Sequence, residues 1–69
     1  MKLNVYLVFN ESSEVLVAAK DASGALSCVD IAYQIGLTTV DVESDYKFHK
    51  VPDINYNDSV NTILNIKNK

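Results

Sequence analysis

The strongest constraint on the fold is a single segment of helical periodicity in a chain that otherwise alternates with a period of two. Between Asp21 and Ile35, apolar side chains recur every three or four residues, the spacing of one face of an α-helix. That face comprises Ala22, Ala25, Leu26, Val29, Ala32 and Tyr33. Asp21 is suited to cap the first turn, and Gly36 supplies the left-handed residue that commonly follows a helix. The sequence therefore predicts one helix, Asp21–Ile35, whose alanine-rich face can approach a sheet closely.

The segments on both sides of this helix alternate apolar and polar residues, which is the pattern of half-buried strands. Residues 3–9 and Glu14–Lys20 are expected to form a hairpin around the turn-rich segment Asn10–Ser13. After the helix, Thr39–Glu43 and Tyr46–Val51 are expected to form two further strands on either side of a tight turn.

The segment Val60–Ile66 fits two structures. Its alternation fits a strand, whereas the spacing of Val60, Ile63, Leu64 and Lys67 fits a helix. The share of β-branched residues favours the strand. The resulting prediction is an α+β fold of order ββαβββ, an antiparallel sheet with the helix Asp21–Ile35 packed on one face. At 69 residues the chain has room for one core, so residues 1–69 are expected to form a single domain.

The register of the first hairpin can be argued from the apolar residues. A three-residue loop, Glu11–Ser13, pairs Phe9 with Val15 and keeps one face apolar. A two-residue loop would place Phe9 opposite Glu14 and bring a charge onto that face. We therefore predict the three-residue loop.

Composition excludes several classes of protein. The lone Cys28 excludes a disulfide framework and a zinc site built on paired cysteines, and no metal or other cofactor is predicted. The first ten residues alternate and lack a signal-peptide pattern, and no apolar run is long enough to span a bilayer. We expect a reduced, cytoplasmic setting without membrane contact. His49 stands without a recognisable nucleophile, and no catalytic pair is marked by spacing, so the sequence predicts that the protein is not an enzyme.

Charge is distributed unevenly along the chain. The formal net charge is −3 with His49 counted as neutral, and the six basic residues are all lysines. The acidic residues Asp41, Glu43 and Asp45 fit one solvated face of a strand, where charge discourages edge-to-edge pairing. The functional alternative is an acidic inhibitor that imitates a polyanion and occupies a nucleic-acid-binding protein.

Aromatic and basic residues interleave just after this acidic group. On a strand, Tyr46, Phe48 and Lys50 would share one face, an arrangement that can stack single-stranded bases. The alternative is that both aromatic rings belong to the core beneath the helix. Nucleic-acid binders carry a basic surplus, which this acidic chain lacks. Nucleic-acid binding is therefore kept only as a second alternative function.

A second apolar strip runs beside the core face of the predicted helix. It consists of Cys28, Ile31 and Ile35, and a helix lying on a sheet does not need it. Either the C-terminal segment covers this strip, or the strip is an association surface. Val8 and Leu16, expected opposite each other on the outer sheet face, favour association. We predict a small non-enzymatic protein-binding or adaptor module that self-associates, with a homodimer as the simplest form.

Overall fold

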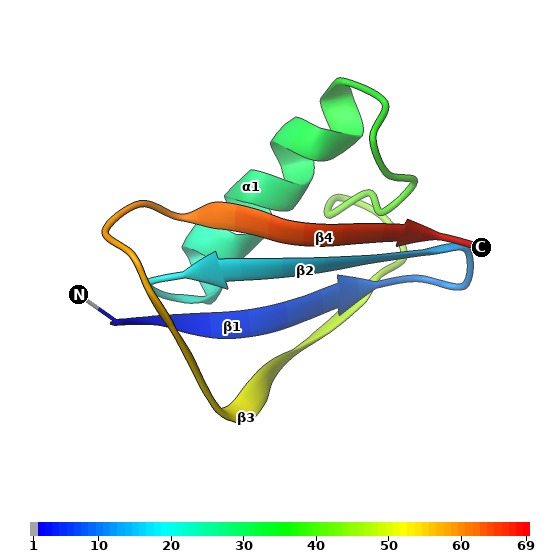
Figure 1. Ribbon diagram of the computed structural model, residues 1–69. Coiled ribbons are helices and arrows are strands. Elements are labelled where there is room, and N and C mark those ends of the chain that lie inside the picture. Colours follow the sequence, from blue (N-terminus) through cyan, green and yellow to red (C-terminus); the bar gives the residue numbers. More distant parts are fainter. Residues whose placement is uncertain (1) are drawn as a thin grey trace.

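The computed structural model describes residues 2–69 and has the predicted α+β fold (Figure 1). One antiparallel sheet of four strands carries one helix, and the element order is ββαββ. The elements are β1 (Lys2–Phe9), β2 (Ser13–Ala19), α1 (Ala22–Gln34), β3 (Lys47–Asn57) and β4 (Thr62–Asn68). The strands are arranged in the order β3-β1-β2-β4, so β3 and β4 form the two edges of the sheet.

The helix begins and ends where its sequence signals predict. The Asp21 side chain accepts a hydrogen bond of 2.8 Å from the amide of Gly24, which satisfies one of the free donors of the first turn. At the other end Gly36 has a φ of 82°, and the amide of Leu37 donates to the carbonyl of Ala32 at 2.9 Å. These two caps confirm the prediction for this element.

The predicted hairpin register is wrong by one residue. β1 and β2 pair Val8 with Val15 and Phe9 with Glu14, which corresponds to the shorter loop. The reason is the side chain of Asn10, whose Oδ1 accepts hydrogen bonds of 2.8 Å from the amides of both residues 12 and 13. This turn closes in the observed register without the left-handed residue that the longer loop needs.

The shift changes which residues of β1 lie beneath the helix. Tyr6 and Val8 pack against α1 and are buried, together with Val15 and Val17 of β2. Phe9, expected in this row, lies on the opposite face of the sheet. β1 is apolar on both faces, so either register gives it an apolar row beneath the helix. The hydrogen bonds of the Asn10 turn therefore determine the register.

The segment between α1 and β3 contains no strand, which contradicts the prediction for Thr39–Glu43. Val40 is fully buried and anchors this segment to the core. The hydroxyl of Thr38 lies 2.6 Å from that of Ser13 and accepts a hydrogen bond from the amide of Val40. Side-chain hydrogen bonds therefore take the place of a strand ladder here.

β3 contains most of the predicted strand Tyr46–Val51 and continues past its predicted end, through Pro52 to Asn57. The strand accommodates the proline with a bulge between Lys50 and Asn55, within which Asp53 has a φ of 60°. Val60–Ile66 lies largely in β4, which confirms the strand and excludes the helix.

The connection from β3 to β4 passes across β1 and β2 to reach the far edge. At its end, the side chain of Asn61 accepts a hydrogen bond of 3.1 Å from the amide of Lys20. This bond fixes the start of β4 beside the end of β2.

The molecule has two layers, and α1 covers one face of the sheet. The buried helix residues Ala25, Val29 and Ala32 face the sheet, and α1 packs mainly on β2. Figure 1 shows α1 crossing the strands obliquely, with its C-terminal turns projecting past the β4 edge. Within residues 2–69, no helix is both long enough and apolar enough to cross a bilayer.

The Asn10 turn gives a first testable prediction. Replacing Asn10 with Ala removes the acceptor for two amides and should lower the free energy of unfolding by about 2 kcal/mol. Asn10→Asp keeps that acceptor but loses the hydrogen bond of 3.1 Å that Nδ2 donates to the carbonyl of Thr39, so it should recover only part of the loss. Denaturant unfolding measures both variants, with Glu11→Ala as the exposed neighbour expected to change stability little. Equal losses in the Ala and Asp variants would contradict the role assigned to Oδ1.

The helix end gives a second prediction. Gly36→Ala should lower the free energy of unfolding by about 1 kcal/mol, because Ala disfavours a positive φ. No atom lies within 4 Å of the position a Cβ would take, so the cost is conformational. Asn tolerates this conformation better, and Gly36→Asn should therefore cost less than Gly36→Ala in the same unfolding measurement. A larger loss in the Asn variant would refute this explanation.

Candidate docking surface

Ile31 and Ile35 are the most exposed apolar residues of the helix and its C-terminal cap. Their exposed fractions are 62% and 66%, and they lie one turn apart on one flank of α1. Cys28 lies on the same flank one turn earlier, half-buried against the core. We call these three residues the helix flank. The structure thus brings together the strip that the sequence singled out, and the C-terminal segment leaves both isoleucines uncovered.

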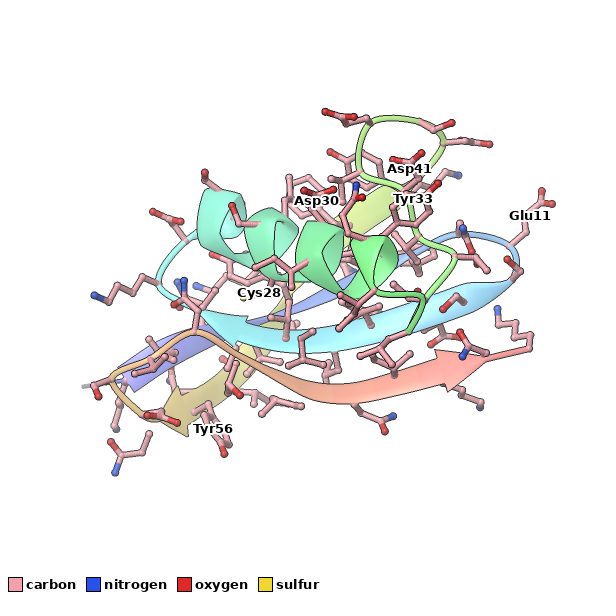
Figure 2. The ribbon with its side chains drawn as sticks, turned by 90° about the horizontal axis from the view of Figure 1, so that it is seen from above. Glu11, Cys28, Asp30, Tyr33, Asp41 and Tyr56 are labelled. Carbon is pink, nitrogen blue, oxygen red and sulfur yellow. The ribbon has the colours of Figure 1, made fainter. Side chains whose placement is uncertain are left out.

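The helix flank lies on the β4 side of the molecule. Gly24 belongs to the same side of α1, and a Cβ at Gly24 would fall 2.5 Å from the side-chain amide nitrogen of Asn61, just before β4. Figure 2 shows Cys28 on the side of α1 toward the sheet and Asp30 on the side of the segment that carries Asp41. A cavity between that other side and the segment is lined by Ser23, Leu26, Ser27, Asp30, Val42 and Glu43. The two sides of α1 therefore differ, one facing the β4 edge and the other facing acidic residues.

β4 presents an unpaired strand edge beside the helix flank. It pairs with β2 on one side only, because the strand order ends at β4. The amide of Lys69 donates to the carbonyl of Ser12 at 2.8 Å, and Val15 lies opposite Ile66. Since hydrogen-bonded and non-hydrogen-bonded pairs alternate along an antiparallel ladder, the amide and carbonyl of Ile66 point away from β2. They are available to another strand.

The two sheet residues expected beside this surface lie elsewhere. Val8 is fully buried beneath α1, so its prediction as an outer-face residue is wrong. The cause is the one-residue difference in hairpin register, which moves Val8 to the inner face. Leu16 is half-buried on the face of the sheet opposite α1, where it pairs with Leu7, and the sheet separates it from the helix flank.

The acidic residues lie on the irregular segment before β3 and not on a strand. Asp41 accepts a hydrogen bond of 3.0 Å from the amide of Glu43, so its carboxylate closes a local turn. Glu43 and Asp45 are exposed. No group of three potential metal ligands occurs in the part of the chain that the structure describes. The polyanion-mimic hypothesis stays a prediction, and nothing in the geometry strengthens it.

The aromatic residues proposed for base stacking do share a side of the structure. The rings of Tyr46 and Phe48 stack with centroids 6.3 Å apart, on the side covered by α1. Tyr46 packs against the core, while Phe48 is 42% exposed. Lys50 is exposed opposite Tyr6. The alternative interpretation, that both rings belong to the core, therefore holds for Tyr46 and not for Phe48, and base stacking stays a prediction.

The thiol of Cys28 lacks the lowered pKa of an activated nucleophile. Desolvation by burial raises the pKa of the Cys28 thiol above its ordinary value. A reactive cysteine needs the opposite shift, which cationic neighbours would supply. Cys28 therefore contributes apolar surface to the helix flank.

Sequence reasoning missed Gly24 and the β4 edge as parts of this site. Gly24, Cys28, Ile31 and Ile35 are separated by four, three and four residues, the a/d spacing of helices that pair with one another. That spacing was the available signal for Gly24. The β4 edge had no signal, because strand order depends on where the β3–β4 connection crosses.

Comparison of the chain with models of protein families, with curated proteins and with solved structures finds no match in any of the three.

Proposed function

We propose that this protein is a small non-enzymatic binding module that self-associates through the helix flank. The observation that carries the proposal is the exposure of Ile31 and Ile35 beside an unpaired strand edge. Adjoining exposed apolar residues of this kind mark contact surfaces. In this proposal the protein works in the cytoplasm, where Cys28 stays reduced.

Three features support a protein partner over other ligands. The flank is apolar and carries no charged side chain, so an apolar surface is its natural complement. It is an exposed helical side and encloses no small molecule. The acidic residues lie on the other side of α1, where they do not oppose association through the flank.

Ile31→Asp tests the proposal directly. The substitution places one charge in each half of the contact and removes two apolar side chains per dimer, which should weaken association at least about 100-fold. Light scattering over a range of protein concentrations measures the average molar mass of the species in solution, and so the fraction that is dimeric. Ser27→Asp makes a matched change at an exposed site on the other side of α1 and should associate as the wild type does. A monomeric wild-type protein, or an Ile31→Asp variant that associates normally, would reject the proposal.

Cys28 supplies a natural chemical probe for a second test. Its alkylation by iodoacetamide should be slower in the folded protein than in the unfolded chain, because burial raises the pKa of the thiol and lowers the thiolate fraction. The rate should fall further as protein concentration rises, because association covers the flank. In Ile31→Asp the rate should not depend on concentration. A wild-type rate that is likewise independent of concentration would count against the helix flank as the contact.

A further inference from the structure

We infer that the partner is a second copy of this chain, with β4 of one protomer paired antiparallel to β4 of the other, so that two sheets join into one of eight strands. This inference rests on the proposed function and specifies its geometry. It starts from the difference between the two edges of the sheet. β3 is protected by Pro52 and by the bulge around Asp53, both of which prevent regular pairing along an edge. β4 has no proline and carries only one charged side chain, Lys67.

The regular part of β4 fixes where two copies can meet. Leu64 is bypassed in the pairing with β2, so the regular ladder runs from Asn65 to Asn68. Within this stretch Ile66 turns its amide and carbonyl away from β2. A two-fold axis through Ile66 makes the two Ile66 residues exchange both hydrogen bonds of an antiparallel pair.

Charge selects this register over the adjacent one. An axis through Lys67 would place the two Lys67 side chains directly opposite each other, which is unfavourable. With the axis at Ile66, Lys67 of each protomer lies opposite Asn65 of its partner. Two such Lys–Asn pairs form, one on each side of the axis.

The same axis brings the two helix flanks together. α1 lies on one face of the sheet, and its C-terminal turns project past β4 (Figure 1). A two-fold axis perpendicular to the sheet at this edge places the partner's helix antiparallel on the same face, where each flank meets the other. The spacing of Cys28, Ile31 and Ile35 suits such helix pairing, while Gly24 is covered by the side chain of Asn61 in its own chain.

These features favour a second copy over a different protein. Antiparallel pairing of identical strands is self-complementary. One two-fold axis therefore pairs the unpaired edge of one chain with the same edge of the other, and packs the two apolar flanks together. Acidic side chains, which would make two copies repel, are absent from β4 and from the flank in the described residues. One contact thus satisfies the backbone of the edge and covers the exposed isoleucines.

The register predicts opposite effects for opposite charges at Asn65. Asn65→Glu places Glu opposite Lys67 twice per dimer and should lower the dimer dissociation constant about 5-fold, whereas Asn65→Lys should raise it by a similar factor. Within its own chain Asn65 is exposed and lies opposite Leu16, so both variants should fold as the wild type does. Asn55, exposed on β3, gives matched controls, because Asn55→Glu and Asn55→Lys lie on the other edge.

Amide hydrogen exchange tests the strand pairing without any substitution. The amide of Ile66 should exchange slowly at concentrations where the dimer forms and quickly on dilution. The amide of Lys67, which points toward β2, should be protected at both concentrations.

The possible outcomes separate the two claims. A wild-type protein that stays monomeric overturns the proposed self-association and this inference with it. Association that Ile31→Asp abolishes, but that both Asn65 variants leave unchanged and that leaves the Ile66 amide unprotected, supports the helix flank and overturns the β4 pairing. Opposite shifts for the two Asn65 variants, together with protection of Ile66, establish the pairing.

Discussion

The packing of α1 on β2 is the contact on which the other features of this molecule depend. Ala25, Val29 and Ala32 are small, and they let the helix approach β2 closely enough to bury Val15 and Val17. Because β2 lies next to the edge strand β4, a helix centred on β2 contacts β1, β2 and β4. Its C-terminal turns extend obliquely past the β4 edge. One helix cannot bury both its own flank and the whole sheet. The exposed isoleucines are the part of the helix that this position leaves without a partner.

The parts of the fold that sequence predicted are those set by local chemistry. Asp21 and Gly36 fix the helix ends because their hydrogen bonds and backbone angles involve only neighbouring residues. The β-branched residues of 60–66 indicated a strand for the same reason. The hairpin register was missed because Asn10 decides it, through two hydrogen bonds that compete with an argument based on apolar pairing.

The parts that sequence could not predict depend on distant contacts. Thr39–Glu43 alternates like a strand, but one buried residue, Val40, and a hydroxyl shared with β2 hold it in place without a ladder. For the site, the three residues of the helix flank were found from their spacing alone. Val8 was misplaced because an error of one residue in register moves a side chain to the other face. The sequence could not predict that β4 is an edge strand, because only the path of the β3–β4 connection across the sheet places β4 beside β2.

That crossing has a consequence for how the chain reaches its folded state. β4 is the last strand in the sequence, yet it pairs with the second strand, β2. The hydrogen bond between the side chains of Ser13 and Asn68 joins residues 55 positions apart. Until β4 docks, β2 keeps a free edge and the core lacks Ile63 and Ile66. Such long loops close slowly, and a partly assembled sheet with an open hydrophobic strand is prone to capture by another chain. Assembly speed and resistance to aggregation should therefore both depend on how rapidly residues 58–61 carry β4 across the sheet.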